Sequence, residues 1–202
     1  MKPTFLLILL FVTGVAVQAQ PTITLLTFES YTFSDKFDTE YGSGRIEDGF
    51  QWGGGLEFGL QETVAIELIY QNMQTDVTYQ GFDGKYKGNF GINYVMLGGT
   101  KYAPLNDKIS GFGTFDMGVA WSNPDKSLNV ESATKFALGG RLGLRVKANE
   151  KVSLRIHCQL FSPVQWAGAG VFIGTGGSGA GVSTGSTIWQ WNLGGSLNFR
   201  LK

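Results

Sequence analysis

The residues best suited to chemistry are few. His157 is the only histidine of the 202-residue chain, and Cys158 beside it is the only cysteine. A nucleophilic catalytic set needs a nucleophile, a base and an orienting group within reach of one another. On its own face of a strand, His157 has Arg155 and Gln159 as neighbours, and neither is a nucleophile or an acid. We therefore predict no catalytic residue and a hydrogen-bonding role for His157.

Metal and cofactor chemistry is not indicated either. No Cys or His residues cluster at the spacing of a metal site. The string from Gly174 to Gly179 matches the dinucleotide-binding pattern G-x-G-x-x-G, but that motif requires a strand before it and a helix after it, which are not predicted here. We predict no cofactor and no metal ligand. Cys158 falls on the apolar side of its segment, where we expect it to act as a small apolar residue.

A larger set of charged side chains shares the polar faces of alternating segments, where it could form ion pairs. Burial would make such pairing necessary, because an unpaired buried charge is strongly destabilising. Two roles fit this set: a structural ion-pair layer that fills a lumen, or a gated ion path or proton relay, and we favour the structural layer. The set consists of Glu57, Glu67, Lys101, Asp116, Arg141, Arg145, Arg155, His157 and Arg200.

The segments that carry these residues alternate between apolar and polar positions. In the last one, 188–201, Trp189, Leu193 and Phe199 share one parity, whereas Asn192 and Asn198 share the other. A strand has a period of two residues, so this pattern places all the apolar side chains on one face. The segment is therefore predicted to be a two-faced strand.

Short and long connections alternate along the chain. The short ones are centred near Glu62, Asn106 and Glu150, which are 44 residues apart. Between connections, each segment is near or above the 9–11 residues that a tilted strand needs to cross a bilayer, whereas soluble strands typically have about 5 or 6. An even number of such strands, with short turns at one end and long loops at the other, is typical of outer-membrane barrels. The eight predicted strands are 23–34, 49–60, 63–74, 90–102, 109–121, 135–147, 152–161 and 188–201.

The alternative is a soluble barrel with an apolar interior. Two observations favour the membrane. The polar parity is mostly Gly, Ser, Asn and Gln, whereas a surface that meets water carries interspersed Lys and Glu. Large aromatic residues also fall near strand ends, as in the two interfacial girdles of membrane barrels. They are Trp52, Tyr70, Trp121, Trp189 and Trp191 near the long loops, and Phe58, Tyr102 and Phe199 near the short turns.

The first residues indicate export. Lys2 precedes an apolar run, 5–12, and the small-residue sequence 17–19 follows, which is the order found in secretory signal peptides. We predict a signal peptide over 1–19 and one barrel domain over 20–202. The 16 basic and 16 acidic residues balance, so the charge gives no indication of a nucleic-acid partner.

Taken together, the chain resembles the small eight-stranded outer-membrane barrels of the OmpA, OmpX and opacity-protein type. The residues that carry the resemblance are the signal peptide, 93–102, the glycine-rich 135–147 and the terminal 197–202. The resemblance implies an all-β, antiparallel, up-and-down transmembrane barrel of eight strands in the outer membrane. It also implies that both termini are periplasmic, and that the partners are outer-membrane lipid and the barrel assembly machinery.

The interior of an eight-stranded barrel is just wide enough for side chains to fill. The second strand then faces the sixth and the third faces the seventh. Glu57 is therefore predicted to point toward Arg141 or Arg145, and Glu67 toward Arg155.

Function on a rigid barrel usually lies in its loops. The candidates for contact with an extracellular protein or surface ligand are Phe82 and Tyr86 in the second long loop, and Trp166 and Phe172 in the last one, which could also form a lid or extend the wall. We predict a non-enzymatic, structural or surface-interaction protein. The alternatives are a narrow channel for small solutes or ions and, second, a membrane lipid-modifying enzyme, since such enzymes occur on this fold.

Overall fold

The computed structural model describes residues 22–39, 42–81, 84–125, 132–163, 170–174, 177–181 and 188–201. Within them, no helix is long and apolar enough to cross a membrane. Residues 1–21 lie outside the described part, so the signal peptide over 1–19 stays a prediction. The strands are β1 (Thr22–Thr32), β2 (Asp35–Thr39), β3 (Gly42–Ile46), β4 (Gly49–Gln61), β5 (Val64–Gly81), β6 (Gly84–Pro104), β7 (Ile109–Pro124), β8 (Thr134–Lys147), β9 (Val152–Pro163), β10 (Gly170–Gly174), β11 (Gly177–Gly181) and β12 (Gln190–Arg200).

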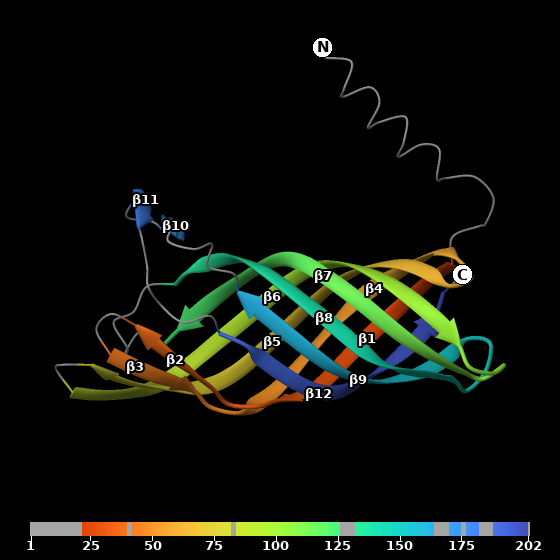
Figure 1. The fold of residues 1–202 in the computed structure, drawn as a ribbon, viewed down its shortest axis with the longest axis horizontal. Coiled ribbons are helices and arrows are strands. Elements are labelled where there is room, and N and C mark those ends of the chain that lie inside the picture. The colour runs from red at the N-terminus through yellow and green to blue at the C-terminus, as the bar shows by residue number, and fades with distance from the viewer. Residues whose placement is uncertain are drawn as a thin grey trace, which may run out of the picture.

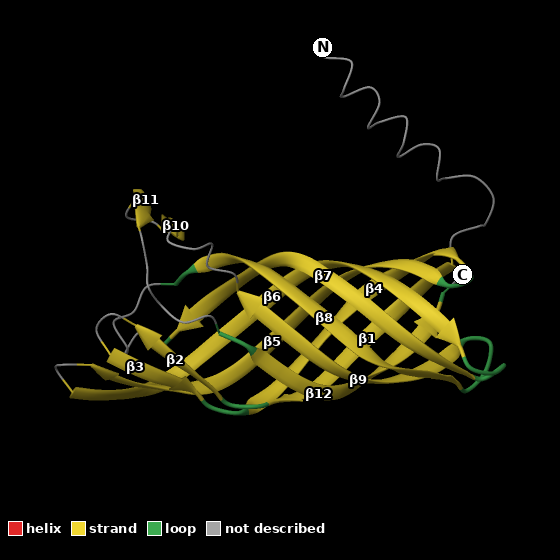
Figure 2. Cartoon of the chain, viewed as in Figure 1, coloured by secondary structure: helices red, strands yellow, loops and turns green. Residues whose placement is uncertain are grey.

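Eight of these strands form a closed antiparallel barrel (Figure 1). The sheet runs β5-β4-β1-β12-β9-β8-β7-β6, and the pairing of β5 with β6 closes it. β1 and β12 pair with each other, so the first and last strands meet in the wall. Each barrel strand is paired on both sides, and the wall therefore has no free edge (Figure 2). The predicted eight-stranded up-and-down barrel is confirmed.

The apolar residues of the wall, which occupy alternate positions along each strand, face outward. In β12, Trp191 and Leu193 are 51% and 56% exposed, whereas Asn192 and Asn198 are buried at 0% and 1%. Such a surface would be unfavourable in water and is suited to lipid, because burying apolar area provides the free energy that holds it there. Cys158 is exposed on the same outer side, as its parity predicted.

β5 and β6, the third and fourth strands of the barrel, are longer than predicted. β5 continues to Gly81, and β6 begins at Gly84, so most of the expected loop 75–89 is a hairpin that extends past the neighbouring strands. Gly84 has a φ of 133°, a conformation that favours glycine. β2 and β3 fall within the first expected loop, and β3 pairs with the extended part of β5. These polar, glycine-containing segments become strands because pairing satisfies their backbone groups.

The structure resolves the parity of β6, where the sequence was ambiguous. Tyr94 and Met96 are buried at 0%, whereas Leu97 is 52% exposed. Leu97 pairs with outward-facing residues on both neighbouring strands, Leu68 on β5 and Met117 on β7, and this register sets the parity of the whole strand.

Candidate functional site

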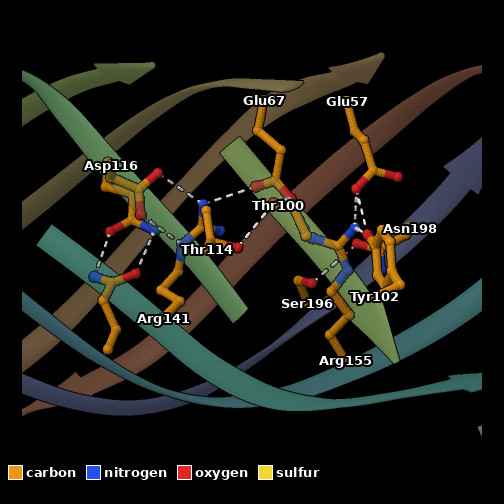
Figure 3. Close-up of polar contacts among 12 residues, drawn as sticks. Glu57, Glu67, Thr100, Tyr102, Thr114, Asp116, Arg141, Arg155, Ser196 and Asn198 are labelled. Carbon is orange, nitrogen blue, oxygen red and sulfur yellow. Dashed lines mark hydrogen bonds and ion pairs between the residues drawn. The ribbon is translucent and has the colours of Figure 1, made fainter. Parts of the chain in front are cut away.

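A network of ion pairs crosses the lumen in the half of the barrel that carries the short turns. Arg141 of β8 is its first centre (Figure 3). Its Nη2 lies 2.7 Å from Oε2 of Glu67 and 3.0 Å from Oδ1 of Asp116, and its Nε donates to Oδ2 of Asp116 at 3.1 Å. The Arg141 side chain is 1% exposed, and both acids are 0% exposed. One guanidinium therefore joins carboxylates of two different strands, β5 and β7.

Arg155 of β9 is the second centre. Its Nη1 donates to Oε1 of Glu67 at 2.9 Å, and its Nη2 contacts both a carboxylate oxygen of Glu57 and the hydroxyl of Tyr102. Glu57 and Glu67 are directly opposite each other on β4 and β5, where like charges repel. Because Arg155 binds both, it neutralises that repulsion (Figure 3).

Neutral hydroxyl groups complete the hydrogen bonding of these acids. Thr100 donates to Oε1 of Glu67 at 2.6 Å and shares a hydrogen bond of 2.8 Å with Thr114. Tyr102 donates to Oε2 of Glu57. All three hydroxyl-bearing residues are buried. Sequence reasoning missed them, because the alternation in β6 is ambiguous and the cross-strand register is what places Thr100 and Tyr102 inside.

Space for the network comes from Gly98. This residue stands between Glu67 on β5 and Asp116 on β7 in the strand register. A Cβ atom there would collide with Oδ1 of Asp116. A residue without a side chain at this position lets the two carboxylates approach the same guanidinium.

Arg145 lies in the lumen without an ion pair in the described part of the chain. Its guanidinium carbon lies 3.8 Å from the centre of the Tyr102 ring, a cation–π contact. It stands opposite Arg155 in the strand register, and the guanidinium carbon of Arg155 lies 5.4 Å from the centre of the same ring. The three carboxylates Glu57, Glu67 and Asp116 balance the formal charges of the three guanidiniums in this part of the lumen.

Two expectations about the charged set and one about an aromatic residue need correction. Lys101 lies on the outer side of β6, where its Nζ donates to the Thr63 hydroxyl at 3.0 Å, because the register of β6 directs odd-numbered residues outward. Glu57 pairs with Arg155 and with neither Arg141 nor Arg145. Because barrel strands are tilted, the residue that lies across the lumen from Glu57 comes from β9 and not from β8, the strand that counting round the barrel places opposite β4. Tyr102, expected in the outer girdle, lies inside.

The remaining members are placed as follows. Glu67 does meet Arg155, and Asp116 is buried beside Arg141. Arg200 is exposed at the short-turn end, at the last position of β12, and has no ion pair within the described residues.

His157 is buried in the lumen at 2% exposure. Its ring stands edge-on to Phe28 at 6.0 Å between centroids. Neither ring nitrogen has a hydrogen-bond partner in the described part of the chain, so the predicted hydrogen-bonding role is not realised there. Among the residues that the structure describes, no nucleophile or acid is bonded to His157, and its side chain faces away from the lipid side of the wall.

Further toward the long loops, amides join the lumen network, and buried apolar groups accompany them. Gln71 and Gln159 exchange hydrogen bonds of 3.2 and 2.8 Å across the lumen, and Gln51 accepts a third of 3.4 Å. A buried apolar cluster packs alongside both the ion pairs and the amides: it includes Phe28, whose ring centre lies 5.1 Å from the guanidinium carbon of Arg141, and it extends to Met73 and Phe161. Ion pairs, amides and apolar groups together fill the interior.

The structure describes little of the four loop candidates. Phe82 and Trp166 lie outside the described residues. Tyr86 and Phe172 belong by their backbones to β6 and β10, and their side chains lie outside the described part.

Within the described residues, no group of three or more His, Cys, Asp or Glu side chains could hold a metal ion. The buried carboxylates Glu57, Glu67 and Asp116 are instead bound by guanidinium groups. The arrangement is therefore suited to closing and stabilising the lumen.

A comparison with protein families shows to which family this barrel belongs. Residues 4–164, most of the chain, match the family described as outer membrane protein beta-barrel domain. The chain belongs to this family. Its members are outer-membrane barrels, so the outer membrane is where this barrel resides. Among curated proteins, none matches the sequence.

Solved structures of this barrel class share the fold. Neisserial surface protein A superposes with a TM-score of 0.60 at 10% identity, covering 89% of this chain and 97% of that one. OprG from Pseudomonas aeruginosa gives 0.52 at 12% identity, with 91% and 99% covered. The outer membrane protease OmpT from Escherichia coli gives 0.52 at 8% identity, with 93% and 100% covered. At these identities the likeness concerns the fold alone.

Proposed function

We propose that this outer-membrane barrel is a closed, non-enzymatic protein that serves as a structural or surface-interaction protein through its long-loop end. The observation that carries the proposal is the occupied lumen beneath a protruding sheet. In this proposal both termini lie on the periplasmic side, as in other barrels with short turns at one end. Outer-membrane lipid surrounds the wall, and the assembly machinery inserts it.

The filled lumen argues against the channel alternative. The ion pairs of Arg141 and Arg155 connect side chains of β4, β5, β7, β8 and β9 across the interior. An ion that passed would have to separate buried, mutually neutralised charges, and each separation would leave an uncompensated charge. The amide hydrogen bonds and the buried apolar cluster add two further obstacles of different chemistry.

The lipid-modifying alternative finds no support in the position of His157. A group that acts on membrane lipid must reach the outer wall or its rim. His157 is 2% exposed and faces the lumen, and the outer side of the same strand presents Cys158 and apolar residues. The proposed role is therefore one that involves no catalysis.

The protruding sheet provides a surface for interaction. Beyond Asp76, β5 and β6 continue as a hairpin, and β3 and β2 extend that sheet on one side. Lys87 forms a 3.0 Å ion pair with Asp76 at its base, and the carboxylate raises the pKa of the lysine. Thr75 donates to the backbone oxygen of Glu47 at 2.7 Å, which ties the segment before β4 to β5. The protruding sheet is thus ordered by its own hydrogen bonds.

The test removes the hairpin of the protruding sheet and keeps the barrel. Asp76 and Asn89 are paired across the hairpin, so residues 77–88 can be replaced by an Asn-Gly turn that closes the ladder there. The matched control replaces the turn 105–108 at the other end. Bacteria that display the wild type or either variant are compared for adherence to immobilised extracellular-matrix proteins and to cultured cells. The proposal expects adherence above that of cells without the barrel, lost only when 77–88 are removed. Equal adherence of all strains would refute the surface-interaction role.

A further inference from the structure

A cavity of about 150 Å³ opens at the long-loop mouth of the lumen, where members of the buried apolar cluster form part of its wall. Its walls come from β3, β6, β7, β8 and the ends of β9 and β12, so five neighbouring barrel strands and the protruding sheet meet around it. Most of the wall is apolar and includes Ile46, Phe90, Ile92 and Ile188. An engineered apolar cavity of about this size admits benzene. The space therefore suits one ring or a short alkyl chain.

A single cation stands in this wall. Lys135 of β8 is half-buried, and no acid forms an ion pair with it in the described part of the chain. By contrast, the buried guanidiniums of Arg141 and Arg155 are each paired with two carboxylates. A partly desolvated ammonium without a counter-ion is complementary to an anion that brings one.

A buried amide offers a second donor. Gln190 is 1% exposed and lines the same cavity. Its Oε1 accepts a hydrogen bond of 2.6 Å from the Tyr94 hydroxyl, and this contact directs Nε2 away from that ring. The acceptor that Nε2 does find is the sulfur of Met73 at 4.0 Å, and a thioether is a weak acceptor. The amide N–H groups therefore have capacity for an oxygen ligand.

We propose that this cavity binds a small amphipathic carboxylate, whose ring or short chain packs among the apolar walls while its carboxylate meets Lys135 and the Gln190 amide. The site is distinct from the ion-pair network, which lies at the other end of the lumen. It is also independent of the surface-interaction role, because it requires no macromolecular partner.

The test measures binding of 3-phenylpropionate to the full-length barrel in lipid nanodiscs by saturation-transfer NMR. The neutral 3-phenylpropanol and the cationic 3-phenylpropylamine have the same ring and chain, and separate the contribution of charge. Lys135→Met removes the ammonium, and Lys101→Met makes the same change at the opposite end, on the outer wall. Ala120→Leu fills the cavity, because Ala120 is a buried part of its wall.

The wild type and Lys101→Met are expected to bind the carboxylate at least about tenfold more tightly than the alcohol, and Lys135→Met to lose that preference, as for one charge-assisted hydrogen bond. Ala120→Leu is expected to abolish binding of both. Native circular dichroism and the heat-dependent gel shift establish that each variant is folded. The proposal is overturned if the wild type does not distinguish the carboxylate from the alcohol. It is also overturned if the two lysine variants bind alike or if Ala120→Leu leaves affinity unchanged.

Discussion

Removing the guanidinium of Arg155 should be strongly destabilising. In Arg155→Met the side chain keeps much of its apolar length, but the contacts to Glu57, Glu67 and Tyr102 disappear. Glu67 retains Arg141 at 2.7 Å and Thr100 at 2.6 Å. Glu57 retains the Tyr102 hydroxyl and no cation, so one buried carboxylate is left uncompensated.

The expected cost follows from that single orphaned charge. Breaking a buried ion pair from one side typically costs about 3–5 kcal/mol. Adding Glu57→Gln to Arg155→Met removes the orphan and should recover at least about 1 kcal/mol, which is within the range of measured couplings between contacting residues. Arg200→Met deletes the same charge at the exposed end of β12 and should change stability by less than about 0.5 kcal/mol.

Reversible urea unfolding in lipid vesicles, followed by tryptophan fluorescence and the gel shift, measures these free energies. The reasoning would be refuted if Arg155→Met and Arg200→Met cost the same. It would also be refuted if the double variant were less stable than Arg155→Met alone, since Glu57 would then be compensated by another group.

Three smaller predictions use other parts of the wall. Tyr102→Phe removes the hydroxyl from a buried carboxylate and should cost about 1–3 kcal/mol in urea unfolding; a cost equal to zero would contradict the hydrogen bond. Gly143→Ala places a Cβ against the carbonyl oxygen of Ile156 and should cost about 1–3 kcal/mol, whereas Gly99→Ala, with nothing within 4 Å, should be nearly neutral. Cys158 should react in the folded, reconstituted protein with a lipid-soluble maleimide and resist a charged, impermeant one, and equal labelling by both reagents would place it in water.

Much of the fold could be predicted because the barrel repeats one simple rule. In β12 every apolar residue has the same parity, and the structure places that parity on the outer wall. In β6 both the odd-numbered and the even-numbered positions carry apolar residues, so the local pattern did not show which set faces outward. There the inward direction of Tyr102 and the outward direction of Lys101 depend on cross-strand register, which involves residues far apart in the chain.

The membership of the ion-pair network was easier to predict than its connections. Glu67 and Arg155 were matched by counting strands around a circle, and they do meet. The same count failed for Glu57, because strand tilt shifts which residues share a level. The hairpin beyond Asp76 was also missed, because its polar residues resemble a loop until backbone pairing with β3 and β6 is known.

The central claim is that buried ion pairs close the lumen, and single-channel recording of the purified barrel in a planar bilayer tests it most directly. We expect no stable conductance from the wild type, because the pairs of Arg141 and Arg155 cross the interior. A stable open channel in the wild type, abolished by Glu57→Gln, would show that the same residues form an ion path and would contradict the closed lumen.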